Sequence, residues 1–401
     1  MSSASVDSSA KGDTAPSYPF SVYVSVAGLF LVEGAVLLGV PVPVTVQQNL
    51  LTVFLLIISC WSAARTPSAQ RETAMTSSDA ATMPLFAGSA LVALYAAFRF
   101  LDPVWVNFVL KAYFVLSGAI AVSFCAAPVA RAALPRARPL FSLALWSLPS
   151  LPTWLGGPAT APPSSKPWEP TAADALALAV GSAIAGWYAA GGGWLANNVL
   201  GFSFCVGAIG VLNPGSFTTA ALLQSALFVY DIVAVFGTGA VLGPNRVSIM
   251  EEVAVRLDGP IKIFFPSPDG NRRMALLGLG DIIVPGSLLA LLLRFDAVQA
   301  LARGGVDGAV FNAVYFNAGV LAYVGGLALT SLALALMDTA QPALLYLVPC
   351  LLFTTLTLAV ARGELGKLWK YDEEAAAAEG TSSVTVGGAG AVAAGETKKD
   401  Q

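Results

Sequence analysis

Residues 274–296 read MALLGLGDIIVPGSLLALLLRFD, an apolar run about long enough to cross a lipid bilayer as a helix. A carboxyl group, Asp281, lies inside this run, and Pro285 follows it four residues later. An aspartate at the centre of a membrane helix costs about 2.5–3.5 kcal/mol on insertion scales, so it usually faces a protein interior or water. The stretch therefore predicts a membrane helix that carries a functional acid.

The whole chain has the composition of a polytopic membrane protein. Of its 401 residues, 56% are hydrophobic and 11% are charged, whereas a soluble protein carries about 25% charged residues. The apolar segments near bilayer length are 20–40, 47–63, 84–101, 105–127, 172–190, 194–212, 216–240, 274–294, 312–336 and 341–361. We expect nine of these ten segments to be spans and leave segment 20–40 out of the count, because it contains Glu33 and ends at Pro41. This segment is a cleaved signal, an extra span or an interfacial segment.

Charge and residue usage exclude several kinds of chemistry. A net charge of -3 without a basic stripe argues against nucleic-acid binding. The chain has no histidine, which excludes Ser-His-Asp catalysis and HExxH metal sites. Four widely spaced cysteines in apolar stretches indicate buried thiols: Cys60, Cys125, Cys205 and Cys350. We expect no metal and no cofactor.

A second intramembrane aspartate, Asp231, lies in ALFVYDIVAVFG. Apart from Lys111, no lysine or arginine lies at a matching depth in any predicted span, so pairing with a buried basic residue is a weak explanation for these acids. Two aspartates on neighbouring helices share one proton, because like charges close together cannot both ionise. The ionised carboxylate can then draw a proton from water while the protonated one polarises a peptide carbonyl, as in an aspartyl protease.

The residues around Asp281 fit such a site. Gly278 and Gly280 have no side chains, so the backbone there can approach the helix of Asp231 closely. Pro285 has no N–H for the carbonyl of Asp281, so we expect a bend there and a released carbonyl that faces a water-filled pocket. Pro342, in QPALLYLVP, fits the first turn of the last helix.

The motifs YD at 230, GLGD at 278 and QPAL at 341, in this order, resemble those of the presenilin and signal-peptide-peptidase families of intramembrane aspartyl proteases. The similarity runs from about residue 45 to about 373 and includes GPIKIFFP; it is greatest to the signal-peptide-peptidase branch. The resemblance implies an all-α, presenilin-like bundle of nine transmembrane helices in which Asp231 and Asp281 are catalytic. It also implies site-shaping and substrate-binding roles for Tyr230, Gly278, Leu279, Gly280, Gln341, Pro342, Ala343 and Leu344.

The resemblance implies substrates that are transmembrane peptides of type II orientation, notably signal peptides left in the endoplasmic reticulum membrane. We expect a disordered tail at 1–19, a protease domain at 45–363 with its PAL helix near 341–361, and a disordered tail at 364–401. Arginines gathered on one side predict that this last tail is cytosolic. It ends with Lys398 and Lys399, a dilysine retrieval signal for the endoplasmic reticulum.

Other interpretations stay open. An ion-coupled transporter would also use intramembrane aspartates, but it predicts matching acids in both halves of the chain. A presenilin-like catalytic subunit of a larger complex, or a homo-oligomer, fits the same motifs. Residues 261–265, which read IKIFF between two prolines, are either an edge strand that accepts an unwound substrate or a segment docked on the membrane interface.

Overall fold

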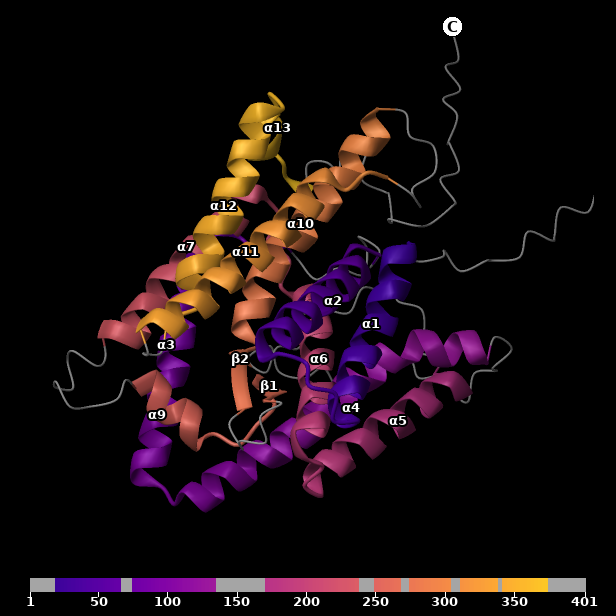
Figure 1. Cartoon of the computed structure of the whole chain (residues 1–401), viewed down its shortest axis with the longest axis vertical. Helices are drawn as coiled ribbons and strands as arrows, with labels where there is room; N and C mark the ends of the chain where they lie inside the picture. Colours follow the sequence, from indigo (N-terminus) through magenta and orange to yellow (C-terminus); the bar gives the residue numbers. More distant parts are fainter. Residues whose placement is uncertain are drawn as a thin grey trace, which may run out of the picture. The chain divides into compact units, whose positions relative to one another are not determined.

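The computed structural model describes residues 19–65, 74–134, 170–237, 249–267, 274–303, 311–337 and 341–373. These residues are mostly helical, and nine of the described helices are long and apolar enough to cross a membrane (Figure 1). The predicted all-α polytopic class is therefore confirmed. The chain divides into two compact units: one is Met1–Ala87, Ile209–Val233 and Asp281–Gln401, and the other is Gly88–Ala208 and Ala234–Gly280.

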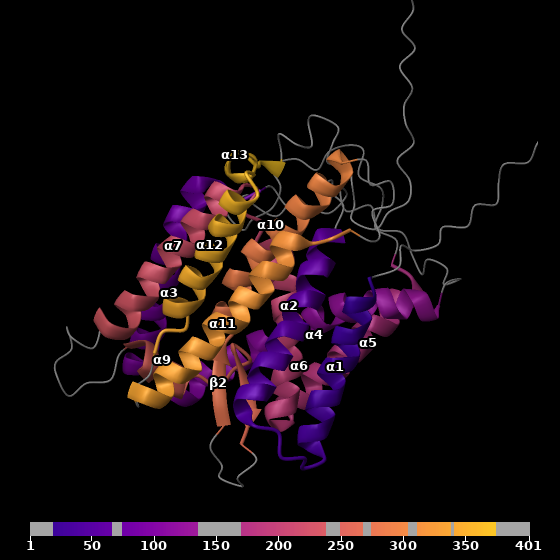
Figure 2. The ribbon, with the colours of Figure 1, turned by 45° about the horizontal axis from the view of Figure 1, so that its top comes forward.

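The first unit contains both predicted catalytic aspartates. Its helices are α1 (Phe20–Leu37), α2 (Val44–Arg65), α7 (Phe217–Ile232), α10 (Gly280–Ala302), α11 (Val314–Met337), α12 (Leu344–Ala361) and α13 (Leu365–Trp369), with the start of α3 (Ser77–Phe100). Helix α10 forms the core, because every residue from Val284 to Ala297 is buried. Helices α7, α11 and α12 lie alongside it (Figure 2).

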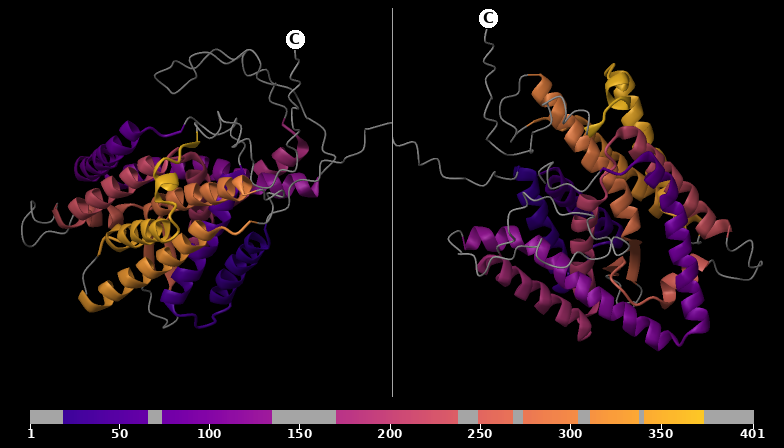
Figure 3. Two further views of the ribbon diagram at one scale, coloured as in Figure 1. Left: turned by 90° about the horizontal axis from the view of Figure 1, so that it is seen from above. Right: turned by 180° about the vertical axis from the view of Figure 1, so that it is seen from behind.

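The second unit contains α4 (Pro103–Ala133), α5 (Ala172–Ala189), most of α6 (Gly193–Val211), α9 (Ile249–Arg256), β1 (Lys262–Pro266) and β2 (Met274–Gly278). Helices α4 and α5 pack along their length (Figure 3). Gly181 permits this close approach, because a Cβ there would lie 2.3 Å from the backbone oxygen of Ala119.

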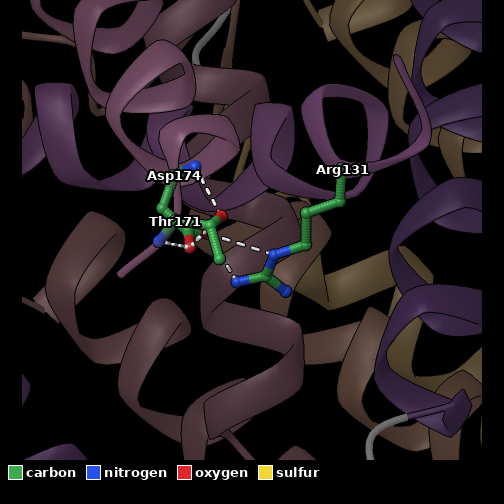
Figure 4. A network of polar contacts seen from close by, with 3 residues as sticks. All are labelled: Arg131, Thr171 and Asp174. Atoms are coloured by element: carbon green, nitrogen blue, oxygen red, sulfur yellow. Dashed lines mark hydrogen bonds and ion pairs between the residues drawn. The ribbon is translucent and has the colours of Figure 1, made fainter. Parts of the chain in front are cut away.

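Helix α5 begins with a capping box (Figure 4). The hydroxyl of Thr171 accepts from the backbone N–H of Asp174, and the Asp174 carboxylate accepts from the N–H of Thr171 at 2.9 Å. Arg131 of α4 donates to the same carboxylate at 2.7 Å, although its own side chain is 64% exposed. This exposed ion pair joins the end of α4 to the start of α5.

The predicted apolar segments agree with the helices, with three corrections. Segment 20–40 forms α1, which is one of the nine candidate spans, whereas α10, formed by most of segment 274–294, is not among them. The helix predicted from residue 274 was wrong at its start: Met274–Gly278 form β2, paired antiparallel with β1, and α10 runs from Gly280 to Ala302. The pairing of Ile263 and Phe265, both fully buried, with Leu277 and Ala275 explains why an apolar stretch is a strand here.

The tail predicted to be disordered from residue 364 is ordered as far as Glu373. Leu368 of α13 is fully buried, and Glu364 accepts from Tyr315 at 2.9 Å and from Arg303 at 2.6 Å. Burial raises the pKa of Glu364, but hydrogen bonds from Arg362 and Tyr315, together with the charges of Arg362 and Arg303, outweigh burial, so its pKa is below its ordinary value. Residues 1–18 and 374–401, with Lys398 and Lys399, lie outside the described residues.

Candidate active site

Asp231 lies in the last turn of α7. Ser216 caps the start of this helix, since its hydroxyl accepts from the N–H of Thr219 at 3.2 Å, and the helix continues beyond Ile232 into a π-helical turn at Val233–Gly237. Asp231 itself is only 5% exposed. Because π-helical turns often occur at functional sites, both its burial and its position favour a functional acid.

The backbone N–H of Leu344 donates to Oδ2 of Asp231 at 3.3 Å. Leu344 is the first residue of α12, where the N–H groups have no acceptor within the helix. A carboxylate at this end is also favoured by the helix dipole. The QPAL motif therefore starts a helix and points a free N–H at Asp231.

The position of Pro342 differs slightly from the prediction. It precedes the first helical residue instead of lying in the first turn, and its carbonyl accepts from the N–H of Leu345 at 3.2 Å. Pro342, Ala343 and Leu344 are all buried. Gln341 is half-buried, and its Oε1 accepts from the hydroxyl of Tyr346 at 3.3 Å.

Asp281 is the second residue of α10 and is half-buried. Pro285 lies inside this helix, so the carbonyl of Asp281 has no N–H donor four residues later. This carbonyl accepts from the hydroxyl of Tyr323 in α11 at 3.3 Å, so a protein side chain, and not the predicted water-filled pocket, is its partner. No motif in the sequence around Tyr323 marks it as the partner of this carbonyl.

A hydrogen bond joins the two aspartate helices. Nε2 of Gln224 in α7 donates to the carbonyl oxygen of Val284 in α10 at 2.6 Å. Gln224 is fully buried, and its amide was not singled out in the sequence. The sequence signal for this contact is an amide side chain inside an apolar helix, because a buried polar side chain needs a hydrogen-bond partner.

The two helices run antiparallel. The N–H of Phe217, at the start of α7, donates to the carbonyl of Tyr371 at 3.4 Å. Two residues later, Glu373 forms an ion pair with Arg294, which lies late in α10. The start of α7 is thus near the later part of α10, whereas Gln224 contacts Val284 ten residues earlier.

Asp231 and Asp281 therefore lie on the same side of the Gln224–Val284 contact. At about 1.5 Å per helical residue, Asp231 lies about 10 Å beyond Gln224 and Asp281 about 4.5 Å beyond Val284. Both displacements run in the same direction because the helices are antiparallel. The aspartates thus lie on neighbouring helices of one unit, on the same side of this contact and offset by about 6 Å along the helix axes.

The other predicted site residues are placed as follows. Tyr230 is half-buried beside Asp231. Gly278 ends β2 opposite Lys262, and the N–H of Leu279 donates to Ile261 at 2.9 Å. A Cβ on Gly280 would meet no atom of the described residues within 4 Å, so the close approach predicted for this glycine is not seen.

Strand β1 has partners on both edges. One edge pairs with β2. On the other edge, the side chain of Asn198 accepts from the N–H of Phe264 and donates to its carbonyl, each at 2.9 Å. Asn197 donates to the carbonyl of Lys262 at 2.7 Å. Of the two alternatives for residues 261–265, the edge strand that accepts a substrate is therefore wrong, because two asparagines of α6 occupy that edge.

Strand β2 offers an unpaired edge. Since the N–H and carbonyl of Phe264 point toward Asn198, those of Leu276, directly opposite, point away from β1. No further strand pairs with β2 in the described part of the chain. The side chain of Leu276 is 53% exposed. This edge leads along the chain through Gly278 to Asp281.

The model of the signal peptide peptidase family matches residues 67–375. The signal peptide peptidase of Mus musculus is 32% identical over 304 residues, 75% of this chain and 74% of the mouse protein. That of Homo sapiens is 31% identical over 305 residues, with the same two shares. Intramembrane protease 2 of Caenorhabditis elegans is 43% identical over 189 residues, 45% of this chain and 38% of the worm protein.

Proposed function

Because the chain belongs to the signal peptide peptidase family of intramembrane proteases, we propose that it is an aspartyl endopeptidase with Asp231 and Asp281 as its catalytic pair. Its substrates are transmembrane segments of type II orientation, notably signal peptide remnants in the endoplasmic reticulum membrane. The observation that carries the proposal is the placement of both acids on the same side of the Gln224–Val284 hydrogen bond.

The pair acts by general acid–base catalysis. One carboxylate takes a proton from a water molecule as the water oxygen attacks the scissile carbonyl carbon. The protonated partner donates to the carbonyl oxygen, where negative charge develops. The carboxyl that took the proton from water then gives it to the leaving nitrogen as the C–N bond breaks, while the other carboxylate takes a proton back from a hydroxyl of the tetrahedral diol, so the pair again holds one proton.

The test is incubation of the purified chain in detergent with a labelled signal peptide. Two complementary fragments support the proposal, and an intact peptide contradicts it. Cleavage by the isolated chain also separates this function from that of a subunit that needs partner chains. Reconstitution with the peptide in either orientation tests the type II preference.

We further propose that an unwound substrate pairs with the free edge of β2. A peptide bond in a helix is shielded, so the substrate must unwind, and its freed backbone groups need partners inside the membrane. The outward N–H and carbonyl of Leu276 are of the kind that β-augmentation uses. Residue 276 lies five positions before Asp281 in the chain.

Leu276→Pro is expected to lower cleavage of a helical transmembrane substrate about tenfold, because leaving one buried backbone group without its partner costs about 1–3 kcal/mol and each 1.4 kcal/mol is about a factor of ten. Proline removes the outward N–H without breaking a β1–β2 bond. Leu276→Ala, which keeps the N–H, is the matched control. Cleavage rates of a helical substrate and of a short extended peptide are compared. An equal loss in both Leu276 variants would indicate that the side chain docks on the membrane interface and that pairing is not involved.

The location is tested through Lys398 and Lys399. Replacing both by alanine is expected to release part of the protein from the endoplasmic reticulum, because a dilysine pair at a cytosolic C-terminus is read by a receptor. Fluorescence microscopy of the tagged chain measures the distribution. An unchanged distribution would show that the two lysines are not a retrieval signal and are only charged residues exposed to solvent.

A further inference from the structure

The carbonyl of Asp281 depends on a donor from another helix. In a regular α-helix it would accept from the N–H four residues later, but that residue is Pro285. A backbone carbonyl without a donor inside a membrane is strongly unfavourable. The hydroxyl of Tyr323 supplies the donor at 3.3 Å and thereby replaces the missing helical hydrogen bond.

Tyr323 is held firmly in place. Its side chain is fully buried. One turn before it, a Cβ on Gly319 would lie 2.4 Å from Cδ2 of Leu289, so α11 is in close contact with α10 there. One turn after it, a Cβ on Gly326 would lie 3.0 Å from Cα of Leu347, so α11 is also tightly packed against α12. Two small residues thus fix the position of the Tyr323 hydroxyl.

The same helix pair contacts both acids. Helix α12 gives the N–H of Leu344 to the side chain of Asp231, and α11 gives the hydroxyl of Tyr323 to the backbone of Asp281. We infer that Tyr323 is a positioning residue, which fixes the turn of α10 that carries Asp281 relative to Asp231. The inference rests on the proposed function of the two acids, and the contact that carries it is made to the backbone carbonyl of Asp281 and not to its carboxyl group.

Tyr323→Phe removes one hydroxyl and leaves the ring. Because a displacement of about 1 Å in a catalytic group can lower the rate by about a hundredfold, we expect kcat to fall by about 10- to 100-fold with KM unchanged. Tyr315→Phe is the matched control: it lies on the same helix, is buried, and loses a hydroxyl that donates to Glu364 at 2.9 Å. Its kcat should stay at the wild-type value wherever the variant is folded.

A double-mutant cycle with Pro285→Ala isolates the cause. Alanine restores the N–H that Pro285 lacks, so the carbonyl of Asp281 regains its helical donor. In this background Tyr323→Phe should change both kcat and Tm much less than it does with Pro285 present. If Pro285→Ala alone is inactive, the comparison of Tm values between the Tyr323→Phe variants with proline and with alanine at 285 still tests the inference.

Two results would overturn the role of Tyr323. One is an equal loss of kcat in the Tyr323→Phe and Tyr315→Phe variants. The other is an effect of Tyr323→Phe on Tm that is the same with proline and with alanine at 285. Failure of the proposed function is recognised separately, by cleavage that survives Asp281→Asn.

Discussion

Replacing either Asp231 or Asp281 by asparagine is expected to abolish peptide cleavage while the chain stays folded and inserted in the membrane. Asparagine has nearly the shape of aspartate, but its amide can neither take up a proton from water nor transfer one to a carbonyl oxygen near neutral pH. General acid–base catalysis contributes about 10²–10⁴-fold in rate, so each variant should lose at least that factor. In the Asp231→Asn variant, the new amide oxygen can still accept from the N–H of Leu344, which preserves the helix contact.

The matched control for this pair is Asp296→Asn. Asp296 lies on the same helix as Asp281 and is only 6% exposed, but its carboxylate accepts from the N–H of Phe316 at 2.9 Å. This variant loses a charged acceptor at the start of α11 and should retain cleavage wherever it is folded. Initial rates of cleavage and Tm in detergent are measured for all three variants. A rate loss in Asp296→Asn as large as that in Asp281→Asn would mean that loss of any buried acid disables the fold.

Arg294→Met is expected to cause the largest loss of stability. Arg294 is 6% exposed and pairs with Glu373, which is 10% exposed, and it donates to Oδ1 of Asn213 at 2.6 Å. Removing one partner of a buried ion pair leaves an uncompensated charge, which costs about 3–5 kcal/mol. The loss should appear as a strongly lowered Tm, with α7 and the ordered end of the chain both released from α10.

Two further variants show whether burial is the cause. Arg294→Met combined with Glu373→Leu removes both charges and should recover most of the lost Tm, because a buried pair replaced by apolar residues is often neutral. Arg131→Met removes the arginine of the pair in Figure 4, which is 64% exposed, and should cost only about 0–1 kcal/mol. Equal losses in Arg131→Met and Arg294→Met would contradict the account.

The acids could be predicted from the sequence because each signal is local. A carboxyl inside an apolar run is visible at Asp231 and at Asp281 without knowledge of the fold, and the order of the three motifs indicates the family. The released carbonyl of Asp281 was predictable for the same reason, since Pro285 acts on its own helix.

The remaining features depend on contacts between distant segments. Nothing in the residues around Tyr323 shows that its hydroxyl meets the carbonyl of Asp281, 42 positions away. Asn198, which covers β1, lies 66 positions before Phe264, so the free edge was assigned to the wrong strand. The tail was predicted as disordered from its composition, yet Glu373 is held by Arg294 of α10.

The most direct test of the central claim is cleavage of one labelled transmembrane peptide in ¹⁸O-water by the purified chain and its two asparagine variants. The wild-type chain should yield two complementary fragments, with one ¹⁸O atom in the new carboxyl group. Neither Asp231→Asn nor Asp281→Asn should yield these fragments. The same fragments from either variant at a rate close to that of the wild type would contradict a catalytic pair of aspartates.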